Sequence, residues 1–243
     1  MLGQDQMRHV PGLRGGRPTR GVGDKTRHAV LRAGERLFAA RGIDGPSLRE
    51  ITAAAGVGNK SALQYHFGSR DGLVSAILAE HGEVLRVRHA LAFERLVLDD
   101  ATDDLFRLCD VLVRPYADFL RDDASQWAYL VISAAVLDSP HRRYEDLQVL
   151  FNDPLVPKLV ELLLRQLDLP EALAAERVLV ATSQVIAAVA TRARHQLEGP
   201  SERVGSPLPL FIANAVDMMV GALTAPVSSG TRAAIDHAPS PRH

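Results

Sequence analysis

The sequence predicts an all-α protein, and three observations lead to this fold class. Apolar residues recur three and four positions apart along most of the chain, and no alternating strand pattern of useful length interrupts them. Hydrophobic residues make up 47% of the 243 residues but aromatic ones only 5%, so aliphatic side chains supply most of the apolar surface. Aspartate-rich caps and proline or Gly-Pro breaks divide the chain into helix-length pieces.

Composition also excludes several classes of protein. The single cysteine, Cys109, rules out an internal disulfide and a cysteine-based zinc cluster, and it suits a reducing cytoplasm. No apolar run approaches the length of a membrane span, and the basic N-terminus lacks a following apolar segment. We therefore expect a cytoplasmic protein with no membrane association, no metal and no cofactor.

Charge is distributed unevenly although the net charge is −1. Residues 1–70 contain 12 Lys or Arg and 5 Asp or Glu, whereas the remainder contains 16 Lys or Arg and 24 Asp or Glu. A basic N-terminal third on an acidic remainder suits a head that binds a polyanion. Residues 1–23 are rich in Gly, Arg and Pro and are expected to be a disordered basic arm, either contacting DNA or simply solvated; its cations are Arg8, Arg14, Arg17 and Arg20.

The segment after this arm predicts three helices. The first spans about 24–41 and ends at Gly42, with Lys25 in its first turn, where a phosphate contact would explain a cation. Ser47 and Glu50 have the spacing of a capping box that opens a second, short helix. A turn at Ala55-Gly56-Val57 then leads to a third helix that ends near His66 or Phe67.

The third helix has the side chains that a helix in the DNA major groove needs. Leu63 and Phe67 lie four apart and point to the core. The remaining side chains are short, hydrogen-bonding, cationic or aromatic groups that face outward. They are Asn59, Lys60, Ser61, Gln64, Tyr65 and His66.

The run LREITAAAGVGNKSALQYHFGSRDGL, preceded by LRAGERLFAARGIDGPS, resembles the DNA-binding region of TetR-family (tetracycline-repressor-like) regulators. The resemblance covers roughly Thr26 to Leu78. One extra residue lies between Val57 and Phe67 relative to the commonest pattern, and Arg70 replaces the usual lysine. The resemblance implies an N-terminal three-helix helix-turn-helix DNA-binding domain followed by a helical ligand-binding and dimerisation domain.

On this basis we expect four base-contacting residues, namely Asn59, Lys60, Ser61 and Gln64. Phosphate contacts are expected from Ser47, Tyr65, His66, Arg70 and Lys25. We expect the DNA-binding domain to span 24–70, the body 71–225 and a disordered tail 226–243. Body helices are predicted at about 70–98, 103–121, 125–138, 143–168, 171–197 and 207–224, with Pro154 and Pro157 breaking the fourth of these. His81 and His89 are expected to face solvent.

The middle helices carry most of the aromatic surface, which favours a small-molecule pocket there, although plain core packing is the alternative. Its expected residues are Phe106, Cys109, Val113, Tyr116, Trp127, Phe151 and Gln184. The resemblance implies that an effector binds among these helices, and the apolar walls favour a largely apolar one. The last two predicted helices are apolar over a wide face in their stretches 179–194 and 210–223. Such a face fits either internal burial or the homodimer that the resemblance implies.

The expected function is that of a homodimeric repressor on a palindromic double-stranded DNA operator, released by a small molecule. No G-x-S-x-G elbow, P-loop or H-E-x-x-H motif is present, and we expect no enzymatic activity. The alternatives are a transcriptional activator of the same fold, a regulator that responds to a protein or to a redox signal at Cys109, or a helical small-molecule-binding or enzymatic body with no operator function.

Overall fold

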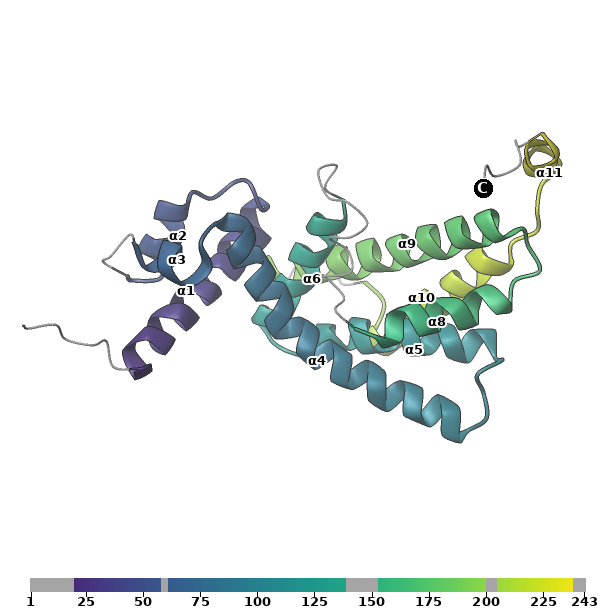
Figure 1. Ribbon diagram of the computed structural model, residues 1–243, viewed down its shortest axis with the longest axis horizontal. Coiled ribbons are helices and arrows are strands. Elements are labelled where there is room, and N and C mark those ends of the chain that lie inside the picture. Colours follow the sequence, from purple (N-terminus) through teal and green to yellow (C-terminus); the bar gives the residue numbers. More distant parts are fainter. Residues whose placement is uncertain (1–19, 58–60, 139–152, 200–204, 238–243) are drawn as a thin grey trace, which may run out of the picture.

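The computed structural model describes residues 20–57, 61–138, 153–199 and 205–237, and these ranges form helices and no strands. A small head lies at one end of an elongated molecule and a larger body at the other (Figure 1). The head contains α1 (Arg20–Arg41), α2 (Leu48–Ala54) and α3 (Ser61–Phe67). Helix α4 (Arg70–Leu98) begins in the head and runs along the body, so one rigid element belongs to both.

The body consists of helices packed around one continuous aliphatic core. They are α5 (Leu105–Ala117), the short 3-10 helix η1 (Asp118–Arg121), α6 (Ala124–Leu137), α8 (Leu155–Arg165), α9 (Glu171–Leu197) and α10 (Leu208–Thr224). These bounds lie close to the predicted ones. The predicted helix 143–168 falls partly outside the described residues. Its described part begins directly after Pro154, whereas Pro157 lies in the first turn of α8 and does not end it.

Two predicted boundaries are wrong. Helix α1 begins at Arg20 rather than near Asp24, so Lys25 lies in the second turn and not among the first free amides. Residues 229–236 form helix α11 (Ser229–Asp236) within the tail that was expected to be disordered. The Ser228 hydroxyl accepts a hydrogen bond from the Thr231 amide at 3.2 Å, and this cap starts a helix that the Ser, Gly and Pro content had obscured. Most of the predicted N-terminal arm lies outside the described residues.

His81 and His89 are buried and do not face solvent, contrary to the sequence-based expectation. Their exposed fractions are 4% and 3%, and each ring bonds a carboxylate from another segment. Those carboxylates, Glu35 and Asp153, are 46 and 64 positions away in the chain. A reading of the α4 sequence alone gives no sign of them.

Helix α9 also differs from expectation, because by length and composition alone it is long and apolar enough to cross a membrane. An 18-residue window has a mean hydropathy of 1.5, and 33% of that window is buried inside the molecule. Helices α10 and α11 meet the same test only as a pair bent by 55°. Packing of α9 against α6 and α10 accounts for one of its faces and leaves the other uncovered.

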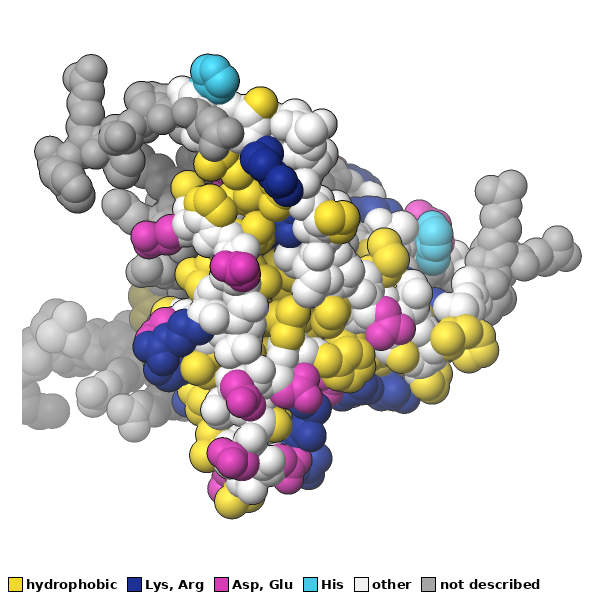
Figure 2. Space-filling model, turned by 90° about the vertical axis from the view of Figure 1, so that its right-hand side faces the viewer, with side chains coloured by type: hydrophobic (Ala, Val, Ile, Leu, Met, Phe, Trp, Pro, Cys, Tyr) yellow, Lys and Arg dark blue, Asp and Glu magenta, His cyan; other side chains and the backbone are white. Residues whose placement is uncertain are grey.

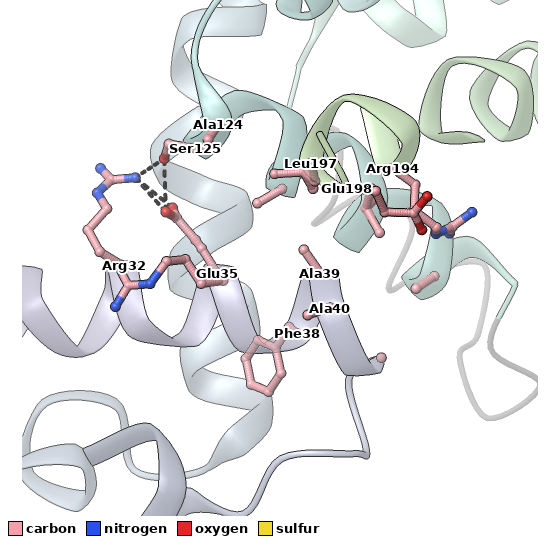
Figure 3. Close-up of a pocket in the computed structure, with 15 residues that line it drawn as sticks. Arg32, Glu35, Phe38, Ala39, Ala40, Ala124, Ser125, Arg194, Leu197 and Glu198 are labelled. Carbon is pink, nitrogen blue, oxygen red and sulfur yellow. Dashed lines mark hydrogen bonds and ion pairs between the residues drawn. The ribbon is translucent and has the colours of Figure 1, made fainter. Parts of the chain in front are cut away.

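Head and body are joined through a buried polar cluster made by Arg32 and Glu35 of α1, His81 of α4 and Ser125 of α6. The Glu35 carboxylate is 1% exposed; one oxygen lies 2.8 Å from His81 Nε2, and the other accepts the Ser125 hydroxyl at 2.8 Å. Arg32 donates to both Glu35 oxygens, at 2.7 and 2.8 Å, and also bonds Glu80 of α4. Figure 3 shows Arg32, Glu35 and Ser125 pointing toward one another. Three helices therefore meet on one carboxylate.

The charged form of Glu35 is the form that this cluster stabilises. Burial by itself raises the pKa of Glu35, but hydrogen bonds from His81, Arg32 and Ser125 outweigh it, and the pKa is lowered from its ordinary value of 4.5. A carboxyl group whose pKa is lower in the folded chain adds stability above its unfolded pKa. This stability is lost as the pH falls through the folded pKa.

We therefore expect Glu35→Gln to lower the free energy of unfolding at pH 7 by ~1–3 kcal/mol, because Arg32 and His81 lose their anionic partner. As the pH falls below 4.5, the wild type loses the same contribution, so the difference between the two proteins shrinks. Urea denaturation at a series of pH values measures this difference directly.

The control is Glu83→Gln, on the exposed part of the same helix, where the carboxylate pairs only with Arg86. This change is expected to leave the urea midpoint at pH 7 unaltered. A Glu35→Gln protein as stable as the Glu83→Gln control at pH 7 would show that the cluster does not hold head and body together.

Candidate nucleic-acid interface and effector cavity

Helix α2 begins with the predicted capping box. The Ser47 hydroxyl accepts from the Glu50 amide at 3.2 Å, and the Glu50 carboxylate accepts from the Ser47 amide at 2.7 Å. The Ser47 backbone and side chain, followed by Arg41, lower the pKa of Glu50. Residues of this box are exposed, so the Ser47 hydroxyl lies at the surface of the head.

The turn between α2 and α3 depends on Gly56, whose φ is +66°. Its amide bonds the Ala53 carbonyl at 3.0 Å, and the next amide, of Val57, bonds the Thr52 carbonyl at 3.1 Å. Residues with a Cβ rarely adopt this left-handed backbone, and glycine adopts it readily. The helix-turn-helix predicted from the sequence is therefore present.

Helix α3 is anchored by the two residues expected to face the core, since Leu63 is 2% and Phe67 9% exposed. Gln64 is exposed, and Tyr65 is the most exposed of the large hydrophobic side chains described, at 82%. His66 is half-buried, and the Tyr65 ring meets it edge-on with 5.0 Å between ring centroids. The helix thus turns a polar and aromatic face outward.

The structure places the other predicted DNA-contacting residues as follows. Asn59 and Lys60 lie outside the described residues, and Ser61 is the first residue of α3. Lys25 is exposed on α1. Arg49, which the sequence analysis did not name, lies in the first turn of α2 with an exposed side chain.

Arg70, expected to contact phosphate, also makes contacts within the head. Its guanidinium donates to the Pro46 carbonyl at 2.9 Å and lies 3.3 Å from the Asp44 carboxylate. These contacts tie the start of α4 to the loop between α1 and α2. The Nε of Arg70 has no partner among the described residues, and the phosphate contact expected of Arg70 stays a prediction.

The far end of the body is acidic. The connection between α4 and α5 carries Asp99, Asp100, Asp103 and Asp104, and acidic side chains gather on the lower part of the end view in Figure 2. This end lies opposite the head (Figure 1). The charge asymmetry of the sequence thus corresponds to two ends of one elongated molecule, which orients the basic head toward a polyanion.

The body contains a small, mainly apolar cavity of about 70 Å³ between α4, α5, α8, α9 and α10. Val113 and Tyr116, both predicted pocket residues, lie on its wall. The Tyr116 hydroxyl is bonded to the Ser133 hydroxyl at 2.8 Å, and burial raises the pKa of Tyr116. The other wall residues were not predicted: Leu85, His89, Leu112, Val156, Val160, Thr182, Val185, Ile186 and Met219.

The remaining predicted pocket residues do not line this cavity. Phe106 is 46% exposed, Gln184 lies on the outer face of α9, and Trp127 is half-buried elsewhere. Cys109 is fully buried in the core, and burial, with Asp104 and Asp110 nearby, raises the pKa of its thiol to about 12. A protonated, buried thiol is a poor sensor of oxidants. Phe151 lies outside the described residues.

A second, wider cavity of about 650 Å³ lies between the head and the body. Its walls come from α1, α6 and the end of α9, including Phe38, Ala39 and Leu197 (Figure 3). The polar cluster around Glu35 forms one side of it. The charged groups of that cluster bond one another, and Arg36, Arg194 and Glu198 add further charged side chains to the walls of this cleft.

Helices α9 and α10 expose large hydrophobic side chains on the face that does not pack on the body. Leu179 and Val180 of α9 are 55% and 53% exposed, and Leu210 and Met218 of α10 are 58% and 64% exposed. The opposite face of each helix is buried in the core through residues such as Val189 and Val216. Internal burial therefore applies to one face of each helix, and the dimer contact expected of the other face stays a prediction. Uncovered apolar surface of this kind marks an interaction site.

Comparisons with known proteins agree with this architecture. Residues 30–77 match the model of the family described as bacterial regulatory proteins, tetR family. The solved structure of HlyIIR, in a mutant with an alanine-substituted segment, is 16% identical, covers 86% of this chain and 100% of its own, and has a TM-score of 0.51. A comparison with curated proteins gives no match.

A second solved structure, described as a tetR family transcription regulator from Shewanella sp. PV-4, is 17% identical. It covers 80% of this chain and 95% of its own, with a TM-score of 0.51. At these identities the two structures show a shared fold, from the head to the last body helices. The match at residues 30–77 identifies the head as the helix-turn-helix DNA-binding domain of the tetR family, and the two structures show that head and body together share the fold of such regulators.

Proposed function

We propose that this protein is a homodimeric, cytoplasmic transcriptional repressor that a small, largely apolar ligand releases from its operator. The observation that carries the proposal is the outward face of α3. Leu63 and Phe67 fix this helix to the head, while the side chains of Gln64 and Tyr65 are exposed and available to contact DNA. A helix held in this way at the end of the molecule is what insertion into a major groove needs.

Within the proposed complex, the residues divide into two groups. Gln64, with Lys60, Asn59 and Ser61 before it, reaches base edges and so reads sequence. Tyr65, His66, Ser47 and Lys25 hold phosphates and set the register of the helix without reading sequence. Arg49 joins this second group because it is exposed on α2 beside the same surface. Residues 24–70 act as the DNA-binding unit and 71–225 as the body.

The proposed dimer forms through the exposed faces of α9 and α10. Leu179, Val180, Leu210 and Met218 on this face are each more than half exposed in the single chain, and a second copy would cover them in a four-helix arrangement. The same contact explains why α9 is apolar enough to resemble a membrane-spanning helix. Two heads in one dimer then meet successive major grooves, about 34–36 Å apart or somewhat more, on a palindromic operator.

Helix α4 provides the proposed route from ligand to DNA. It lines the body cavity through Leu85 and His89, and it is bonded to α1 through His81 and Glu35. A ligand that widens the cavity displaces α4, and the buried cluster passes the displacement to the head. The ligand releases DNA only if it binds the altered spacing of the heads better than the DNA-bound one.

A gel shift with the purified protein and the DNA upstream of its own gene tests the proposal as a whole. We expect a sequence-preferring complex that persists at 200 mM salt, where purely electrostatic binding has weakened steeply. Equal affinity for upstream and random DNA would contradict the role as an operator-binding regulator. Stronger transcription in the presence of the protein would show an activator instead.

Lys60→Ala is expected to weaken operator binding by ~1–3 kcal/mol while random DNA is bound nearly as before, because a base contact contributes only on the correct sequence. Lys25→Ala, the matched control, is expected to weaken both complexes equally, because a phosphate contact is independent of sequence. Fluorescence anisotropy titrations on the two duplexes measure both losses. Equal losses on both duplexes for Lys60→Ala would remove it from the base-reading group.

Leu210→Glu is expected to convert the dimer into a monomer and abolish operator binding, because it places a charge in the centre of the proposed apolar interface. Leu98→Glu makes the same change at a side chain that is 78% exposed at the end of α4, outside this interface. Analytical ultracentrifugation is expected to show a dimer for the wild type and for Leu98→Glu. A dimer that survives Leu210→Glu with unchanged affinity would place the interface elsewhere.

A further inference from the structure

His89 lies deep in the body, 3% exposed, with its ring orientation set by one carboxylate. Its Nδ1 lies 2.7 Å from an Asp153 oxygen, and the other Asp153 oxygen accepts the Leu155 amide at 2.9 Å. Both oxygens of the Asp153 carboxylate thus accept N–H groups. The carboxylate lies at the start of α8, where a negative charge is favoured. With its proton on Nδ1, a neutral His89 ring has a lone pair on Nε2.

That second nitrogen, Nε2, is buried and has no hydrogen-bond partner among the described residues. Buried polar atoms without a partner are rare in folded proteins, and each calls for an explanation. His89 lies on the wall of the 70 Å³ cavity, where the neighbouring groups are mainly aliphatic. The nearby Tyr116 hydroxyl is hydrogen-bonded to Ser133 rather than to His89 Nε2.

We propose that His89 Nε2 is the polar recognition point of the effector site and accepts a hydrogen bond from a ligand hydroxyl or N–H group. This inference rests on the proposed function, in which an effector enters this cavity. It defines the ligand class as small, largely apolar molecules with one hydrogen-bond donor, such as phenols and short alcohols. Asp153 is a positioning residue, because it holds the tautomer that leaves Nε2 free to accept.

The cavity must widen to admit such a ligand, since an engineered cavity that holds benzene measures about 150 Å³. Its walls come from five helices, and Met219 of α10 offers the most adaptable side chain among them. Entry of a ring therefore pushes α4 and α10 apart. This displacement moves α4, which contacts the head through His81, and α10, which is proposed to form the dimer contact.

The test uses calorimetric titration of the full-length protein with phenol and with fluorobenzene, which has nearly the same shape and no donor. We expect phenol to bind about tenfold more tightly, the effect of one buried hydrogen bond. Benzaldehyde, which only accepts, is expected to bind no better than fluorobenzene. Equal binding of phenol and fluorobenzene, or preference for benzaldehyde, would overturn the assignment of Nε2 as an acceptor.

His89→Asn is the matched variant, because the shorter amide can still donate to Asp153 but places nothing at the position of Nε2. We expect phenol affinity to fall about tenfold to the level of fluorobenzene, while fluorobenzene affinity stays within about threefold. Thermal denaturation of the variant checks that it is folded. Unchanged phenol affinity in a folded variant would contradict the proposal.

A measurement on the wild type alone covers the case in which the variant does not fold. In protein labelled with ¹⁵N-histidine, phenol is expected to shift the Nε2 resonance of His89, and fluorobenzene is expected to leave it nearly in place. No shift with phenol overturns the inference.

These readouts involve no DNA, so they separate this inference from the proposed function. Phenol that binds through His89 without loosening the operator complex leaves the inference standing and argues against ligand release. An operator complex without any phenol binding supports the regulator and rejects the ligand class.

Discussion

A carboxylate buried where three helices meet is the constraint on which the arrangement of this molecule depends. Glu35 belongs to the DNA-binding head, yet its oxygens are bonded by His81 of α4 and Ser125 of α6, which belong to the body. Burying such a charge is costly unless every acceptor is satisfied, so the cluster tolerates little displacement of any one helix. Head and body consequently behave as one unit until something breaks or shifts these bonds.

This constraint also explains why the wide cleft beside the cluster does not by itself loosen the molecule. About 650 Å³ of space separates parts of α1 from α6 and the end of α9, and small side chains such as Ala39 and Ala128 line it. Helix α1 nevertheless packs on α6, and Phe38 beside the cleft is buried in the core. The hydrogen bonds of Glu35 add a directional restraint on rotation of the head that apolar contacts do not supply.

Local features were predictable from the sequence, and features made by distant partners were not. The capping box of Ser47 and Glu50, the turn at Gly56 and the outward face of α3 all depend on residues within about ten positions of one another. The burial of His81 and His89 could not be foreseen, because their carboxylate partners lie 46 and 64 positions away. The contacts of Arg70 within the head were missed for the same reason, since its partners lie in a loop 24 and 26 positions earlier. In the pocket, Val113 and Tyr116 followed from their aromatic and aliphatic surroundings, whereas the α8 and α10 walls required the fold.

The two buried histidines lie on one helix, eight residues or about 12 Å apart, and this spacing gives the proposed signal a short route. His89 lies on the cavity wall and His81 holds Glu35, so a displacement of α4 at one histidine reaches the other within two turns of rigid helix. Close-packed interiors do not absorb such a displacement, since they change between discrete arrangements. A ligand that widens a cavity of only 70 Å³ must move its walls, and α4 is the wall that continues into the head. The small volume of the cavity is therefore part of the proposed mechanism, because a roomier site would admit the same ligand without moving any helix.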